Sequence, residues 1–219
     1  QVNAQRAAAA ERASKEGQER IQAARNAASK ADWILSQCIQ EPHAYLASKG
    51  FPEFPGLVWL PVQEKNILCI PMYITGNLCG VQMISRHGEK KFLSGQATSK
   101  AEYCIDAAGI GGDDWWVEGY ASGLSLRACL NALKMRYRLH ICFSAQNLKR
   151  MAHSGYVIAD NDSSLTGLNA ARATGLPYWM PDQEGTDIND YHKLHGTFKT
   201  SQVLRKWLQN IADEKAYYQ

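Results

Sequence analysis

Two acidic clusters in this chain each follow directly after a short apolar run. Glu118 and Gly119 come after Trp115–Val117, and Asp160-Asn161-Asp162 comes after Tyr156–Ala159. Such runs are typical of buried parallel strands, so we expect the acids to emerge where those strands end. Open α/β sheets bind their ligands at that edge. An oxygen-rich pocket there suits Mg²⁺ or Mn²⁺, which makes metal-dependent phosphoryl transfer the leading hypothesis.

The spacing of the acids supports this chemistry. Asp160 and Asp162 lie at i and i+2, so both carboxylates point to the same side of an extended strand end. Gly119 is expected to let the chain turn sharply and leave the Glu118 carboxylate uncovered. Clustered carboxylates repel one another unless a divalent cation neutralises them.

Two further acids, Asp187 and Asp190, follow a fourth apolar run at the same expected sheet edge. They could help to hold a second ion, as in two-metal phosphoryl-transfer sites. The cofactor expected is therefore Mg²⁺ or Mn²⁺, in two or more copies.

Structural roles compete with the metal site for the same residues. Glu-Gly is common in turns, and the segment 160–164 could form an Asx-turn and the N-cap of the next helix. Either cluster alone favours such a role, whereas the two together, each after a hydrophobic run, favour the metal site. An EF-hand fits poorly because the required Gly and Glu do not follow.

Composition places the chain among ordinary globular sequences. It has 219 residues, 45% hydrophobic and 21% charged, enough for one large domain or two small ones. The net charge of +3 permits a nucleic-acid partner without requiring one. Its six cysteines include no Cys-x-x-Cys pair, so we expect no zinc site and a reducing, cytoplasmic location. No apolar run reaches the length of a bilayer span, so no membrane partner is expected.

The elements expected to position the acids fall into three parts. Residues 1–31, rich in Ala, Arg, Glu and Gln, predict a solvated helical linker or tether. Residues 32–110 predict a smaller, β-rich (α+β) basic subdomain built as an antiparallel meander. Residues 111–219 alternate strands and helices, which predicts an α/β parallel sheet with flanking helices on both faces. A glycine-rich segment at 109–112 is the expected hinge.

Individual elements follow from periodicity. We expect an amphipathic helix from Ala31 to about Glu41 and a short helix from His43 to Lys49. The expected strands are 57–60, 67–73, 78–84, 91–93, 115–117, 140–143, 156–159 and 176–180. The expected helices of the last part are 121–133, 145–153, 165–174 and 202–212.

The order of apolar strand, Glu118-Gly119, intervening α/β segment, second strand and Asp160-Asn161-Asp162 resembles the Toprim domain of primases, topoisomerases and related nucleases. Cys79–Gly95 is similar to the basic segment before this domain in DnaG-type primases. Pro42–Gly50 and Phe143–Leu148 look more like the Toprim primases of phages and plasmids. The resemblance covers roughly residues 42–204.

The resemblance implies a DNA primase core that copies single-stranded DNA into short RNA primers from ribonucleoside triphosphates. Glu118 would be a metal ligand or general acid/base, and Asp160 and Asp162 would bind the catalytic metal, with Asp187 and Asp190 completing the set. A ribonucleotide 3′-OH would attack the incoming triphosphate in line. The resemblance also implies a zinc-binding domain upstream, as is common in such relatives, and a helicase domain or partner that follows.

The resemblance also implies a nucleic-acid-binding set. Arg86, Lys90 and Lys91 would contact nucleotide phosphates or the template backbone, with Lys91 also in the catalytic set, and Asn147 would join them. A solvated β-hairpin turn is the alternative for the basic cluster. One departure concerns the residue two places after Glu-Gly-Tyr, an acid in cellular primases but Ser122 here.

Two other functions remain open at this stage. The same acids could serve a Toprim nuclease that hydrolyses DNA. Alternatively, the chain could be a non-catalytic nucleic-acid-binding module that keeps the fold for assembly with a helicase.

Overall fold

The structure, a computed structural model, describes residues 2–61, 66–106 and 111–217. It is mixed α/β and divides into two compact units, each built on a five-stranded sheet. Gln1–Tyr45 and Glu53–Ser99 form the first unit, and Leu46–Pro52 and Lys100–Gln219 form the second. Part of the expected hinge, residues 109 and 110, lies outside the described residues.

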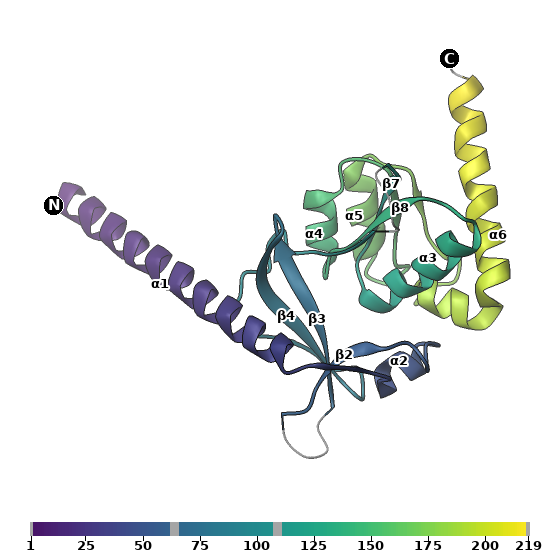
Figure 1. The fold of residues 1–219 in the computed structure, drawn as a ribbon. Coiled ribbons are helices and arrows are strands. Elements are labelled where there is room, and N and C mark those ends of the chain that lie inside the picture. Colours follow the sequence, from purple (N-terminus) through teal and green to yellow (C-terminus); the bar gives the residue numbers. More distant parts are fainter. Residues whose placement is uncertain (1, 62–65, 107–110, 218–219) are drawn as a thin grey trace. The chain divides into compact units, whose positions relative to one another are not determined.

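The first unit begins with a long helix and continues as an antiparallel meander (Figure 1). A short helix, α2, follows the first strand, and its residues from Leu46 onward belong to the second unit. The elements are α1 (Val2–Ser36), β1 (Ile39–Glu41), α2 (Ala44–Ser48), β2 (Gly56–Trp59), β3 (Ile67–Ile74), β4 (Asn77–Ser85) and β5 (Lys90–Phe92). Each strand pairs antiparallel with the next, as the sequence pattern predicts.

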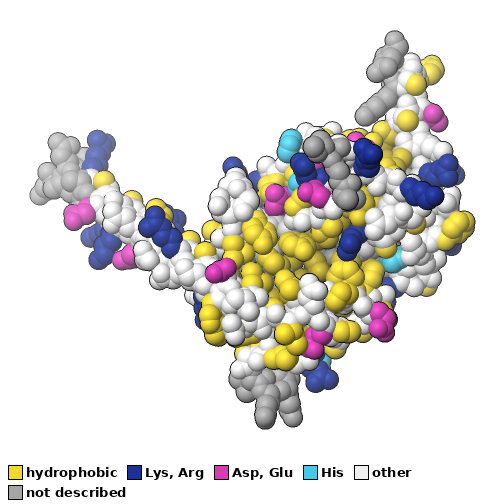
Figure 2. All heavy atoms as spheres, viewed as in Figure 1, with side chains coloured by type: hydrophobic (Ala, Val, Ile, Leu, Met, Phe, Trp, Pro, Cys, Tyr) yellow, Lys and Arg dark blue, Asp and Glu magenta, His cyan; other side chains and the backbone are white. Residues whose placement is uncertain are grey.

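Helix α1 is exposed over most of its length, and Figure 2 shows Lys, Arg and acidic side chains along it. Only its final third contributes to a core, where Ala27, Ala31 and Ile34 recur at helical spacing and are buried. They pack with Cys69 and Val81 of the sheet.

The helix expected to reach Glu41 ends at Ser36 instead. Ile39 pairs with Val58 in β1, so its assignment to a helix was wrong. Pro42 disfavours helical backbone at Glu41, and the edge of the sheet offers this segment backbone partners.

The second unit carries strands alternating with helices. Its elements are β6 (Tyr103–Asp106), β7 (Asp113–Val117), α3 (Tyr120–Ala132), β8 (Tyr137–Ile141), α4 (Ala145–Met151), β9 (Tyr156–Ile158), α5 (Thr166–Thr174), β10 (Tyr178–Trp179) and α6 (Ile188–Tyr217). The strand order is β10–β9–β7–β8–β6. Every strand expected between residues 57 and 180 is present, with its ends displaced by no more than three residues.

The sheet of the second unit is only partly parallel. Strands β10, β9, β7 and β8 run parallel, whereas β6 pairs antiparallel with β8. The expectation of a wholly parallel sheet is therefore corrected at β6, whose residues fall in the range first assigned to the basic subdomain. Without β6, the edge of β8 would present unpaired backbone groups.

Helices cover both faces of this sheet. Figure 1 shows α4 and α5 on one side of β7 and β8, with α3 and α6 on the other, and each pair is in mutual contact. Successive side chains of β7 point to these two faces in turn. Trp115 contacts Trp207 of α6, with ring centroids 6.3 Å apart, whereas Trp116 packs in a cluster with Leu148 and Ala170 of α4 and α5.

Helix α6 is much longer than the segment expected at 202–212. It starts at Ile188 and continues through a kink at Gly196, whose φ of 75° and ψ of 166° are not helical. The polar first half and the glycine concealed this part of the helix from a periodicity argument. None of the described helices has the length and apolar character needed to cross a membrane.

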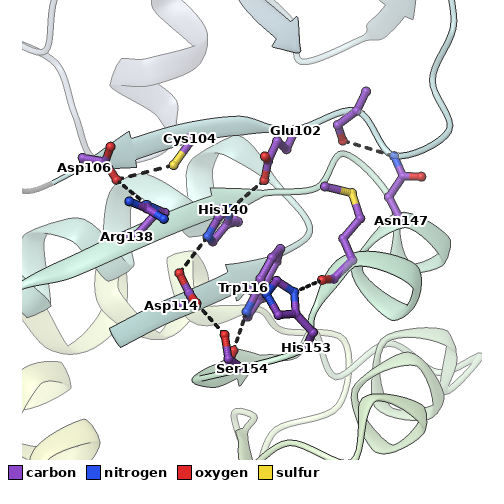
Figure 3. Close-up of polar contacts among 12 residues, drawn as sticks. Glu102, Cys104, Asp106, Asp114, Trp116, Arg138, His140, Asn147, His153 and Ser154 are labelled. Carbon is purple, nitrogen blue, oxygen red and sulfur yellow. Dashed lines mark hydrogen bonds and ion pairs between the residues drawn. The ribbon is translucent and has the colours of Figure 1, made fainter. Parts of the chain in front are cut away.

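A buried histidine joins three segments of the second unit (Figure 3). His140 of β8 lies between two carboxylates, with Nδ1 2.6 Å from Glu102 Oε2 and Nε2 3.2 Å from Asp114 Oδ1. Its ring stacks on Trp116 at 3.8 Å between centroids. Ser154 Oγ donates to Asp114 Oδ2 at 2.5 Å. We call Glu102, His140, Asp114 and Ser154 the His140 clamp; it ties β8 to β7 and to the residue before β6.

The His140 clamp predicts acid-sensitive stability. Burial raises the pKa of Asp114, but the hydrogen bonds from Ser154 and His140 outweigh it, so the pKa lies below 3.8. The carboxylate therefore stabilises the fold above pH 3.8, and this contribution disappears as the pH falls through the folded value. We expect Asp114→Asn to lower the free energy of unfolding at pH 7 by about 1–3 kcal/mol, measured by urea denaturation.

Asp106→Asn is the matched control. Asp106 pairs with Arg138 at 3.1 Å, but both side chains are more than half exposed. Asp106→Asn should therefore lower the free energy of unfolding by less than about 1 kcal/mol. If Asp114→Asn and Asp106→Asn lower the free energy of unfolding equally, the His140 clamp does not have the stabilising role described.

Candidate functional site

The pairing of β7 with β9 places the two acidic clusters side by side. Trp115 and Trp116 of β7 pair with Tyr156 and Val157 of β9, in parallel. Continuing this register sets Glu118 level with Ala159, one residue before Asp160. Neighbouring parallel strands lie about 4.8 Å apart, so Glu118 and Asp160 leave the sheet next to each other at its carboxyl edge.

This point of the sheet is also where its connections reverse. The chain leaves β7 through α3 toward β8, on one side, and leaves β9 through α5 toward β10, on the other. Helices α3 and α5 belong to the groups that cover opposite faces (Figure 1). Such a topological switch point is where open α/β sheets bind ligands.

A third segment is tied to the same edge through Asn161. The Asn161 amide donates to Thr186 O at 3.0 Å, and Gly185 N donates to Asn161 O at 2.6 Å. The Asn161 side chain also donates to Pro181 O at 2.9 Å. These bonds hold the loop before Asp187 against the Asp160–Asp162 segment.

Asp187 in turn contacts the first turn of α3. Ser122 Oγ donates to Asp187 Oδ2 at 3.1 Å, and Ser122 follows Glu118 by four residues. The segments that carry Glu118, Asp160 and Asp187 therefore meet at one edge. No local pattern around Ser122 predicts this contact, because its partner lies 65 positions away in the chain.

Asp162 has the structural role that the competing interpretation expected. Its Oδ1 accepts from Thr166 N at 3.2 Å, and its Oδ2 accepts from Gly167 N at 2.9 Å, at the start of α5. Ser164 Oγ also donates to Oδ1. The Ser164 hydroxyl first, followed by these backbone amides, lowers the pKa of Asp162. Asp162 thus supplies acceptors for the first two amides of α5, although the residue at the N-cap position itself is Leu165.

Asp187 and Asp190 form a reciprocal cap at the start of α6. Asp190 N donates to Asp187 Oδ1 at 2.9 Å, and Asp187 N donates to Asp190 Oδ2 at 3.3 Å. This is the geometry of a capping box, with an acid at both of its positions. Both residues are therefore engaged in starting α6.

The donor chemistry of this edge fits a hard divalent cation, because all the side chains involved are carboxylates. Within residues 2–61, 66–106 and 111–217, however, no group of three or more His, Cys, Asp or Glu side chains could hold a metal ion as they stand. A carboxylate has about four lone-pair sites. Asp187 accepts two hydrogen bonds and so keeps lone pairs that an ion could use, whereas Asp162 already accepts three.

The backbone after β7 corrects one expectation. Gly119 has φ −101° and ψ 152°, an extended conformation that any residue adopts. A Cβ there would lie 3.5 Å from Ser122 Oγ, an ordinary contact. The sharp turn expected to require glycine is absent, and the half-buried Glu118 is followed by an ordinary helix start.

The structure separates the predicted nucleic-acid-binding residues. Arg86, Lys90 and Lys91 lie on the hairpin between β4 and β5 in the first unit. Lys90 pairs with Ile84 and Lys91 with Met83, so the two lysines project from opposite faces of the sheet.

Asn147 belongs to the second unit and is 4% exposed. Its side chain accepts from Lys100 N at 3.0 Å and donates to Cys142 O at 3.0 Å and Ala101 O at 3.3 Å. Contact with a nucleic acid would require Asn147 to leave this network. Its assigned role in binding stays a prediction.

The cap made by Asp162 is testable by substitution. Asp162→Ala should lower the free energy of unfolding by about 1 kcal/mol, because two amides of α5 lose their acceptor. Asp162→Asn keeps an acceptor oxygen and should lower the free energy of unfolding by only a few tenths of about 1 kcal/mol. Urea denaturation at pH 7 compares the two, and equal stability of Asp162→Ala and the unmodified protein would refute the cap.

The close approach of α5 to the strand end is a second test. A Cβ at Gly167 would meet Asp160 O at 2.4 Å, whereas a Cβ at Gly17 in α1 has nothing within 4 Å. Gly167→Ala must therefore shift α5 away from Asp160 and should cost roughly 1–3 kcal/mol. Gly17→Ala should instead stabilise by about 0.4–1 kcal/mol. Thermal unfolding measures both, and a neutral Gly167→Ala would show that the helix is not held against Asp160.

A scan against models of protein families, a search of curated proteins and a search of solved structures each find no match to this chain. The functional argument therefore depends on the residues and on the geometry that brings them together.

Proposed function

We propose that this chain is the catalytic core of a Toprim-type DNA primase, which synthesises short RNA primers from ribonucleoside triphosphates on single-stranded DNA. The observation that carries the proposal is the position of Glu118 and Asp160, which end adjacent parallel strands at a topological switch point. The four parallel strands, with helices on both faces, are compatible with a Toprim-like sheet.

In this proposal, Glu118 and Asp160 would hold a divalent ion, with Asp162 and Asp187 contributing their remaining lone pairs and Asp190 supporting Asp187. The ion, when bound, would neutralise charge on the triphosphate and the attacking oxygen. Glu118 would also accept the proton of the ribonucleotide 3′-OH as that oxygen forms its bond to the α-phosphorus and pyrophosphate leaves.

The supporting residues have positioning roles. Ser122 fixes the Asp187 carboxylate at 3.1 Å, and Asn161 fastens the loop before Asp187 to the end of β9. Arg86, Lys90 and Lys91 would contact phosphates of the template or the nucleotide. An upstream zinc-binding domain and a helicase domain or partner are part of the same proposal, by resemblance to such primases.

A second candidate is a nucleic-acid-binding module without catalysis. The observation in its favour is that Asp162, Asp187 and Asp190 all serve as helix caps. Residues used in this way retain a structural purpose even in a chain that has no metal chemistry. Binding of single-stranded DNA without synthesis would be its signature.

Two substitutions test the catalytic proposal. Glu118→Gln and Asp160→Asn should each reduce incorporation of labelled ribonucleotides on single-stranded DNA by about a hundredfold or more. They should also weaken Mn²⁺ binding measured by calorimetry, because each removes a charged oxygen ligand. Asp113→Asn is the matched control, since Asp113 is an exposed acid at the opposite end of the same strand and should retain both activities.

The outcomes separate the alternatives. Primer synthesis that survives Glu118→Gln would overturn the catalytic assignment. Cleavage of the DNA in place of synthesis would indicate the nuclease. Retained DNA binding with neither reaction would favour the module.

A further inference from the structure

The sheet of the first unit carries a cavity that the proposed reaction does not use. Its volume is about 520 Å³, within the range of small-molecule sites, roughly 300–1,000 Å³. It lies at the end of the sheet formed by the start of β3, the end of β4 and the following hairpin. The lining residues are Trp59, Pro61, Asn66, Ile67, Met83, Ser85, Arg86, His87, Glu89 and Lys91.

The floor of the cavity is apolar and contains an aromatic ring. Trp59 pairs with Ile67 across β2 and β3, so their side chains share one face of the sheet. Met83 lies on that face too, because Ile67 pairs with Ser85 two residues away. All three floor side chains are half-buried. Trp33 of α1 forms a T-shaped pair with Trp59, with centroids 6.1 Å apart and planes at 82°, and so restrains the Trp59 ring.

The rim is cationic. Arg86 and Lys91 are exposed, and Lys91 faces the cavity because it pairs with Met83. Among the lining residues that the structure describes, Arg86 and Lys91 are opposed by one carboxylate, that of Glu89. The hairpin that carries them is closed by Gly88 N donating to Ser85 O and Ser85 N donating to Glu89 O, each at 2.9 Å.

We propose that this cavity binds one unpaired base of single-stranded DNA, stacked on Trp59, with the adjoining phosphate at Arg86 and Lys91. An aromatic wall beside a cationic rim is how single strands are held without sequence preference. The site would serve the proposed primer synthesis by holding template, but all its residues belong to the first unit and none is a carboxylate of the candidate metal site.

The test uses a fluorescein-labelled single-stranded DNA oligonucleotide of mixed sequence, with binding followed by anisotropy in the presence of EDTA. Chelation keeps the result independent of the candidate metal site, so failure here and failure of the proposed function can be told apart. Trp59→Ala should weaken binding about fivefold to a hundredfold through loss of stacking, and Trp59→Phe should restore most of it. Lys91→Gln should weaken binding and reduce the dependence of log K on log salt by about 0.7.

Lys15→Gln is the matched control. It removes the same charge from the exposed half of α1, where Glu11 and Glu19 flank Lys15 at helical spacing, and should leave affinity and salt dependence unchanged. Circular dichroism checks that Trp59→Ala folds; Lys91→Gln alters only an exposed side chain, so it tests the site in any case.

Unchanged affinity in Lys91→Gln, or in a folded Trp59→Ala, would overturn the proposal. Equal weakening by Lys91→Gln and Lys15→Gln would show that only diffuse charge is involved and would also overturn it. A free ribonucleoside triphosphate that displaces the oligonucleotide at equal concentration of nucleotide would exclude the single-strand assignment.

Discussion

The parallel pairing of β7 with β9 is the constraint on which the candidate site depends. Strand β9 follows β8 in the chain, yet it does not pair with β8. It pairs instead with the edge of β7 that faces away from β8. If β9 had instead extended the sheet beyond β8, Asp160 would lie two strands away from Glu118. Backbone hydrogen bonding between two short strands, held by Trp115 and Trp116 packing on opposite faces, therefore decides whether the two acids can act together.

The same edge combines two demands on its carboxylates. Helices α5 and α6 both begin there, and each leaves backbone amides that need acceptors. Asp162 and Asp187 satisfy them, and the positive ends of the two helices favour negative charge at these positions. A divalent ion would compete for the same oxygens but would also relieve repulsion among them. Helix capping and metal binding are therefore linked, and a change in one should alter the free energy of the other.

Local patterns in the sequence predicted the strands and most helices because apolar runs and turn residues are local signals. They could not give the order of strands, since nothing in Tyr156–Ile158 specifies β7 as its neighbour. Strand β6 was missed as a member of the second sheet, because its position depends on the edge of β8 and on Glu102 reaching His140. The cap at Asp162 was foreseen as an alternative from its local spacing. The contact of Ser122 with Asp187 was not, because it joins residues 65 positions apart.

A crystal structure of the protein soaked in Mn²⁺, with anomalous scattering used to locate the ion, tests the central claim most directly. The account predicts a manganese peak at the carboxyl edge of β7 and β9, coordinated by oxygens of both Glu118 and Asp160. A well-ordered site with Glu118 and Asp160 directed apart, and no manganese between them at a concentration that supports activity, would contradict it.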